Sequence, residues 1–144
     1  MRNMKLTIKK IKEVYNALSK ANASKLNDTE FKKVLAILKK IYPLQAEAKE
    51  DAQRAIDLAK PADWEEIQEL LTKVQAEVAT PEESVRALTA NGAFNRRVEA
   101  AIADIDRVEH DIDIEPMSEE LADKIAKESG FTFAGRMALM PVVE

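Results

Sequence analysis

TIKKIKEVYNAL (residues 7–18) and DTEFKKVLAILKKIY (residues 28–42) both repeat large apolar side chains at steps of three and four. This spacing places those side chains on one face of an α-helix and leaves the lysines on the other faces. Thr7 can cap the first helix, and Asp28 or Asn27 can cap the second. Because a short polar connector joins them, the two helices are predicted to form an antiparallel hairpin.

The apolar faces of this hairpin are predicted to meet in one buried cluster. A leucine buried in such a cluster typically stabilises a protein by about 2–5 kcal/mol relative to alanine. The predicted members are Ile11, Tyr15, Leu18, Phe31, Val34, Leu35 and Leu38.

Pro43 lies inside a helical pattern that continues to Ala59. Proline removes one helical hydrogen bond and disfavours helical dihedrals at the residue before it. We therefore expect a kink or a break in the helix at this point. The charge balance also changes here, from Lys-rich before the proline to rich in Asp and Glu after it.

Three further helices are predicted in the middle of the chain. The first begins at Asp63, and the second begins at Thr80 with proline at its first helical position. Asn91-Gly92 is predicted to end this short helix, because both residue types tolerate a left-handed backbone. The third covers residues 94–108, where apolar side chains again recur at helical spacing.

The period changes towards the C-terminus. Residues 110–116 alternate apolar and acidic side chains, which predicts a short extended segment with one face packed. Ser118 is predicted to cap another helix, closed by Gly130. Residues 131–144 contain seven large apolar side chains. We expect this tail to dock on its own chain, with burial against a second copy or a partner as the alternative.

These patterns predict a mostly α fold. The expected architecture is an antiparallel helical hairpin within a five- to six-helix bundle, with one short extended segment near the C-terminus. Residues 1–144 are expected to form a single helical domain, because 144 residues suffice for one core and no long linker interrupts them.

The charge is distributed unevenly along the chain. Residues 1–42 contain eleven Lys and Arg against three Asp and Glu, whereas residues 43–144 contain eleven against twenty-three. Such a chain either neutralises one part with the other or presents a basic surface to an acidic partner.

The absence of cysteine excludes disulfides and thiolate metal sites. With no readable signal peptide and no apolar run long enough to span a bilayer, we expect a cytoplasmic protein that does not use a membrane.

Few residues carry a signature of catalysis. His110 is the single histidine, and with Asp106 four positions earlier it could touch a metal ion, although a solvent-facing pair is the favoured interpretation. Glu65, Glu66 and Glu69 bring carboxylates one helical turn apart, which is typical of an acidic first turn of a helix. We therefore expect no enzyme activity, no cofactor, no metal and no small-molecule substrate.

The candidate interaction surface combines basic and apolar residues. Paired lysines on both hairpin helices are predicted to form one positive face, and adaptable apolar residues of the tail are predicted to accept another protein. Ten of the eleven basic residues before position 43 are lysines, which argues against bidentate reading of bases by arginine. The candidates are Lys9, Lys10, Lys32, Lys33, Lys39, Lys40, Met137, Leu139 and Met140.

Both ends of the chain resemble a family of small proteins of unknown function encoded by bacteriophages and prophages. The resemblance is carried by KLTIKKIKEVYNAL (5–18), FNR (94–96), IDIEPM (112–117) and MALMP (137–141). It implies a phage accessory or assembly-related protein, and it implies no catalytic residue.

The expected function is therefore protein–protein interaction by a phage or prophage accessory protein, with an assembly or chaperone-like role and no catalysis. The expected partner is another protein or a second copy of the chain. The alternative is a nucleic-acid-associated protein that uses the Lys-rich hairpin. Salt dependence distinguishes the two, because binding to phosphates weakens steeply with salt.

Overall fold

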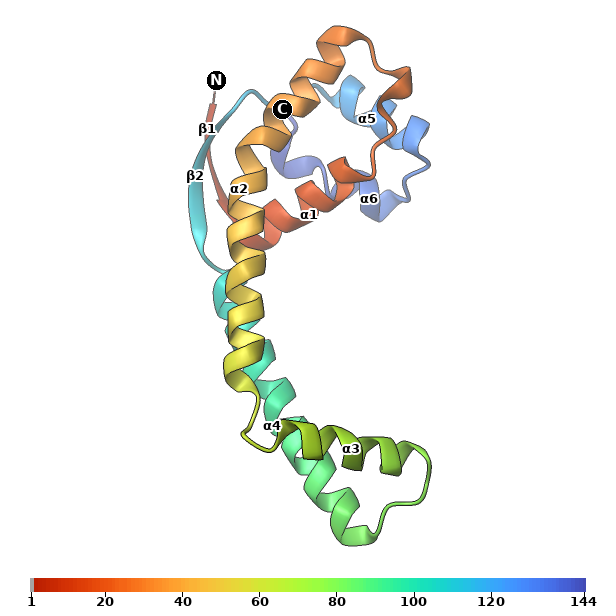
Figure 1. The fold of residues 1–144 in the computed structure, drawn as a ribbon. Helices are drawn as coiled ribbons and strands as arrows, with labels where there is room; N and C mark the ends of the chain where they lie inside the picture. Colours follow the sequence, from red (N-terminus) through yellow and green to blue (C-terminus); the bar gives the residue numbers. More distant parts are fainter. Residues whose placement is uncertain (1) are drawn as a thin grey trace. The chain divides into compact units, whose positions relative to one another are not determined.

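The computed structural model describes residues 2–144. The described chain is mostly helical with one small antiparallel sheet, which confirms the predicted fold class (Figure 1). In chain order the elements are β1 (Arg2–Thr7), α1 (Ile8–Ser19), η1 (Ala23–Lys25), α2 (Asp28–Ala59), α3 (Trp64–Gln75), α4 (Pro81–Asp106), β2 (Glu109–Ile114), α5 (Glu119–Ser129), α6 (Phe133–Met137) and η2 (Met140–Val142).

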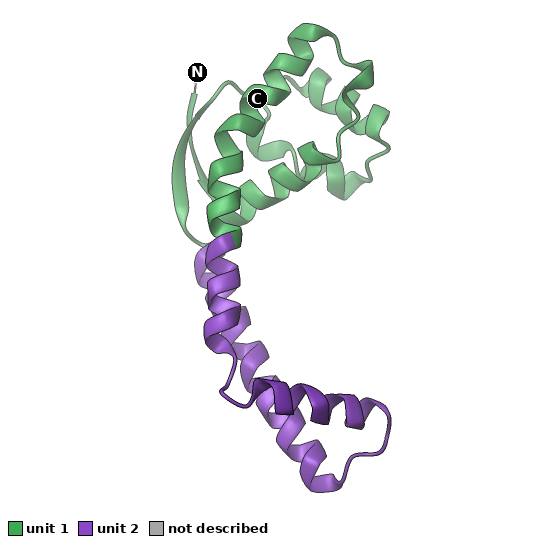
Figure 2. Cartoon of the chain, viewed as in Figure 1, with its two compact units in different colours: residues 1–49, 106–144 green, residues 50–105 purple. Residues whose placement is uncertain are grey.

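The chain divides into two compact units, coloured separately in Figure 2. Unit 1 consists of the residues up to Lys49 together with Asp106–Glu144, and unit 2 consists of Glu50–Ile105. Unit 2 is therefore inserted between two parts of unit 1. The expectation of a single domain over residues 1–144 stays a prediction.

The helix starts follow the capping signals in the sequence. The backbone N–H of Lys10 donates to Thr7 Oγ1 (3.2 Å), as predicted. At α2 the cap is Asn27, because Asn27 Oδ1 accepts from the Glu30 N–H while Glu30 Oε1 accepts from the Asn27 N–H, both at 2.9 Å. Thr80 and Glu83 form the same reciprocal pair at α4. Ser118 caps α5, and each of these caps satisfies an otherwise unpaired backbone donor.

The buried face of α2 differs from the predicted one. Ile37 is 1% exposed although it was not predicted in the cluster, whereas Phe31 is 45% exposed. Ile11, Leu18 and Val34 are buried as predicted, and Tyr15, Leu35 and Leu38 are only partly buried. The burial follows the stripe Val34, Ile37 and Ile41, so the helix is rotated relative to the predicted orientation.

Pro43 does not break α2, which runs through it as one helix of 32 residues. The alternative of a break is therefore wrong, and the alternative of a kink stays a prediction. An interior proline costs about 3 kcal/mol in a helix, but Pro43 itself is exposed. Ile41 before it and Ala48 after it are both buried, so packing on either side offsets that cost.

Asn91-Gly92 does not end a helix either. One helix, α4, covers both predicted segments from Pro81 to Asp106. Glycine permits a left-handed backbone but does not require it. Ala87 before the pair is fully buried in a cluster with Ile67 and Leu70 of α3. After the pair, Phe94 contacts Trp64 with ring centroids 4.3 Å apart, so α3 holds α4 helical on both sides.

The predicted extended segment is strand β2, and its partner β1 was not predicted. The two strands pair antiparallel, with Arg2 opposite Ile114 and Thr7 opposite Glu109. Ile112 and Ile114 are buried while the acidic residues that alternate with them, Asp111, Asp113 and Glu115, are exposed, as the alternation predicted. β1 contributes one fully buried side chain, Leu6, which is too weak a pattern to predict a strand by itself.

The C-terminal tail docks on unit 1, as expected. Leu139 and Val142 have no exposed area, and Val143 forms a parallel bridge with Met117. The Met117 N–H donates to the Val142 carbonyl (2.9 Å), and the Glu144 N–H donates to the Met117 carbonyl (3.0 Å). Phe133 is 81% exposed, so only the second half of the tail is core.

Two helices end in the same hydrogen-bond motif with different residues at its left-handed position. At the end of α5, Gly130 has φ of 67°, and the Phe131 N–H donates to the Ala126 carbonyl. At the end of α3, Glu77 has φ of 61°, and the Val78 N–H donates to the Lys73 carbonyl. Glycine adopts this conformation without steric cost, whereas Glu77 is strained.

We predict that Glu77→Gly stabilises the protein by about 1 kcal/mol, because it relieves the left-handed strain. Gly130→Ala is predicted to destabilise it by a similar amount, and no atom lies within 4 Å of the added Cβ, so the effect isolates the backbone. Urea unfolding monitored by circular dichroism measures both changes. If Glu77→Gly left the midpoint of urea unfolding unchanged, this would contradict the backbone strain assigned to Glu77.

We predict that Ile37→Ala costs about 2–5 kcal/mol of unfolding free energy, as for other fully buried aliphatic side chains. Leu35→Ala should cost less, since Leu35 is only partly buried. Lys10→Ala is the surface control and should stay within about 0.5 kcal/mol. A larger loss for Leu35→Ala than for Ile37→Ala in urea unfolding would show that the observed helix rotation is wrong.

Candidate functional site

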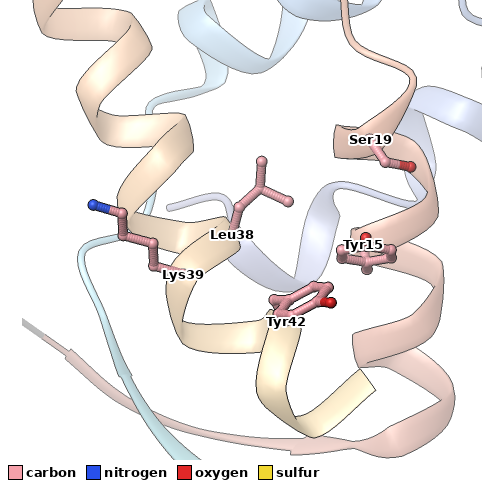
Figure 3. Close-up of a pocket in the computed structure, with 5 residues that line it drawn as sticks. All are labelled: Tyr15, Ser19, Leu38, Lys39 and Tyr42. Atoms are coloured by element: carbon pink, nitrogen blue, oxygen red, sulfur yellow. The ribbon is translucent and has the colours of Figure 1, made fainter. Parts of the chain in front are cut away.

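An apolar groove lies between α1 and α2 in unit 1. Figure 3 shows its lining residues: Tyr15 and Ser19 from α1, and Leu38, Lys39 and Tyr42 from α2. Its volume is about 370 Å³, which lies within the range of pockets that hold a small ligand or a few side chains. The groove has a mostly apolar lining and is open on one side.

The groove exists because α2 carries two adjacent apolar stripes. At about 100° per residue, positions 34, 37 and 41 share one face of the helix, and the second stripe lies beside it. The first stripe is buried, so the second lies at the border of the core and its side chains are partly exposed. The members of the second stripe are Phe31, Leu35, Leu38 and Tyr42.

Two tyrosines form the aromatic part of the groove. The rings of Tyr15 and Tyr42 lie with centroids 5.9 Å apart and a tilt of 45°. Figure 3 shows the rings approaching each other from the two helices, with Leu38 directed into the space between the helices. Tyr42 is 54% exposed, so its ring contacts Tyr15 on one side and remains open on the other. Tyr15 and Leu38 were predicted as core, and the structure places them at its edge.

Lys39 is at once a lining residue and one of the predicted surface lysines. Its ammonium group extends away from the tyrosine pair (Figure 3). A lysine placed in this way covers apolar surface with its aliphatic stem and keeps its charge in water. The groove is therefore apolar inside and positive at its α2 edge.

The predicted lysines are not neutralised within the described chain. Lys33 is partly buried, and Lys9, Lys10, Lys32, Lys39 and Lys40 are exposed. None of the six makes an ion pair within residues 2–144, in contrast to Lys12, whose Nζ lies 2.7 Å from Asp106 Oδ1. Lys124 of α5 likewise binds Glu30 at 2.7 Å, which lowers the pKa of that carboxyl through the hydrogen bond.

The apolar candidates of the tail divide into surface and core. Met137 and Met140 are exposed. Leu139 has no exposed area, so its assignment to an interaction surface is wrong. It packs inward because the turn at α6 and η2 places it with Val142 in the core of unit 1.

His110 and Asp106, which the sequence offered as a possible metal-binding pair, lie in different elements and have structural partners. His110 lies on strand β2 opposite Leu6 and not on a helix with Asp106, which ends α4 and binds Lys12. The pair therefore does not share a helical face. Within residues 2–144, no three His, Asp or Glu side chains gather in a group suited to a metal ion.

Glu66 belongs to an ion-pair cluster in unit 2. Arg86 of α4 binds Glu66 through Nη1 (2.7 Å) and Asp63 through Nη2 (2.8 Å), which joins α4 to the start of α3. The hydrogen bonds from Arg86 lower the pKa values of both carboxyl groups and raise the pKa of the guanidinium. All three groups are solvent-accessible, so the cluster supports the helix pair without forming a buried site.

We predict that this cluster makes unit 2 sensitive to acid. Because the folded-state pKa values of Asp63 and Glu66 lie below their ordinary values of 3.8 and 4.5, their stabilisation is present above those values. It is lost as the pH falls through the lowered values. Arg86→Gln should therefore lower the melting temperature at neutral pH, and its difference from wild type should shrink below about pH 4.

Arg97→Gln is the control for this measurement, since Arg97 is an exposed arginine of the same helix without an ion pair within residues 2–144. Its melting temperature should differ from wild type by the same amount at every pH. A constant difference for Arg86→Gln from neutral pH to about pH 3 would contradict the assigned role of the cluster.

No helix in residues 2–144 is long and apolar enough to cross a membrane. No protein-family model, no curated protein and no solved structure matches the chain. The groove and the charges around it are therefore the features of this chain that point to a function.

Proposed function

We propose that the chain is a non-enzymatic accessory protein that binds another protein through the groove between α1 and α2. The observation that carries the proposal is the half-exposed Tyr42 in an apolar groove bordered by lysines without ion pairs. Aromatic side chains at the edge of a core are typical anchors of protein interfaces. Exposed apolar surface next to polar residues is likewise typical of a binding site.

The groove offers binding groups and no catalytic set. Its polar groups are the hydroxyls of Tyr15, Ser19 and Tyr42 and the ammonium of Lys39, which is directed away. Catalysis by a serine requires a base within hydrogen-bond reach, and no histidine or carboxylate lines this groove. The chemistry of the lining favours the docking of apolar side chains.

The resemblance of both chain ends to phage and prophage proteins supports an accessory role, in assembly or as a chaperone-like factor. The second candidate function is association with nucleic acid. It is favoured by the six lysines without ion pairs, which supply the charge needed to bind phosphates.

We predict that Tyr42→Ser weakens binding of the partner about tenfold or more, because truncation of an aromatic anchor is typically among the most costly changes at an interface. The partner is first enriched from producing cells on immobilised wild-type protein, then purified and titrated by calorimetry. Phe133→Ser is the matched control, since Phe133 is an exposed aromatic residue of unit 1 outside the groove.

Equal binding by wild type and Tyr42→Ser would overturn the groove as the docking site. A gel-shift titration with duplex DNA at about 0.15 M salt tests the second candidate. Tight binding that is unaffected by Tyr42→Ser would favour nucleic acid over a protein partner.

A further inference from the structure

We infer that the groove receives an acidic amphipathic helix, which seats a large apolar side chain against Leu38 and Tyr42 and places carboxylates beside Lys32 and Lys39. This inference rests on the proposed function, since it specifies the partner of the same groove. It follows from the order of side chains around α2 and from the charge of the hairpin.

The order around α2 places one pair of lysines at the groove and one pair away from it. Lys32 and Lys39 are seven positions apart, on the same side of the helix, and directly beside the exposed apolar stripe. Lys39 lines the groove itself. Lys33 and Lys40 have the same spacing but lie across the buried stripe, and Lys33 lines a different hollow with Lys124 of α5.

The hairpin has the charge to attract an acidic segment. Residues 8–42 contain nine lysines and three acidic residues. One of those acidic residues, Glu30, is already bound to Lys124, and one of the lysines, Lys12, is bound to Asp106. The six candidate lysines make no ion pair within residues 2–144. Complementary charge of this kind accelerates association and selects the partner.

The apolar stripe has the geometry to receive a helix. Phe31, Leu35, Leu38 and Tyr42 recur at steps of four, three and four, so they extend along about three turns of α2. A partner helix that lies along this stripe presents its own apolar side chains at the same steps. Its flanking positions then face Lys32 and Lys39, where carboxylates find opposite charge.

Nucleic acid fits this arrangement less well. Phosphate binding depends on the number of lysines and little on which side of α2 they lie. The groove offers one open aromatic face, that of Tyr42, because Tyr15 contacts the other side of the ring, so a run of stacked bases finds no platform there. The lysine pairs on opposite sides of α2 therefore distinguish the two partners.

The test uses fluorescence anisotropy with a labelled peptide of about 15 residues that has Phe and Leu one helical turn apart and Glu at the flanking positions. A Gln-for-Glu peptide and a Ser-for-Phe/Leu peptide are the controls. We expect the acidic peptide to bind wild type, and both controls to bind about tenfold more weakly or worse. Raising the salt concentration from about 0.05 to about 0.5 M should weaken binding of the acidic peptide to wild type, because salt screens the attraction between charges.

The protein variants form a matched set. Lys32→Glu/Lys39→Glu should lower the affinity for the acidic peptide about tenfold. Lys33→Glu/Lys40→Glu should change that affinity less than about threefold. Tyr42→Ser should lower the affinity for the acidic peptide about tenfold. All four lysines lie on exposed or partly exposed positions, so the variants are expected to fold, and circular dichroism verifies this.

The outcomes separate the two proposals. Equal binding of the Gln peptide and the acidic peptide, or equal effects of the two lysine pairs on the acidic peptide, would overturn the acidic partner and leave the groove as a docking site. No binding of any peptide would also overturn it, while the Tyr42→Ser titration with the enriched partner still tests the groove. Both proposals would be overturned if duplex DNA displaced the peptide and if Lys32→Glu/Lys39→Glu and Lys33→Glu/Lys40→Glu lowered the affinity for DNA equally.

Discussion

The pairing of β1 with β2 is the constraint on which unit 1 depends. It brings residues 2–7 against residues 109–114, and α1 begins directly where β1 ends. The Ile8 N–H donates to the Val108 carbonyl (2.9 Å), so the first turn of α1 is attached to the chain that enters β2. The orientation of α1, and with it one wall of the groove, follows from this attachment.

The long interval between the two strands carries little thermodynamic penalty. The entropic cost of closing a loop grows only logarithmically, by about 0.6 kcal/mol for each doubling of length. Unit 2 can therefore be inserted between the two parts of unit 1. Side-chain ion pairs across the same interval, from Lys12 to Asp106 and from Glu30 to Lys124, reinforce the closure.

The sequence predicted what is local and missed what depends on distant partners. Caps at Thr7, Thr80 and Ser118 were predictable because each is a contact between residues three positions apart. β1 was missed because its reason to be extended is β2, more than a hundred residues away. From their own propensities, Pro43 was expected to kink or break a helix and Gly92 to end one. Packing of the neighbouring residues keeps both helices continuous.

The groove was missed for a related reason. The apolar residues of α2 from Phe31 to Tyr42 cover a wider arc than one packed face requires. That excess was the available signal, but it does not tell which edge of the arc is buried. The packing of the rest of unit 1 decides this, and it buries the stripe with Ile37 and leaves the stripe with Tyr42 at the surface.

The uneven charge was predicted either to be neutralised within the chain or to present a basic surface, and unit 1 shows part of both. Unit 1 contains sixteen basic and fourteen acidic residues, so the C-terminal part nearly balances the Lys-rich start in number. In space the balance is incomplete, because the described acidic partners engage Lys12 and Lys124 and not the six candidate lysines. Because the candidate lysines of α2 make no ion pair within residues 2–144 and Lys39 lines the groove, an apolar groove and a positive edge coincide on one helix. An apolar groove alone would accept many partners, and a basic face alone would accept any polyanion. Their coincidence beside Tyr42 is what gives the surface a basis for selecting one class of partner.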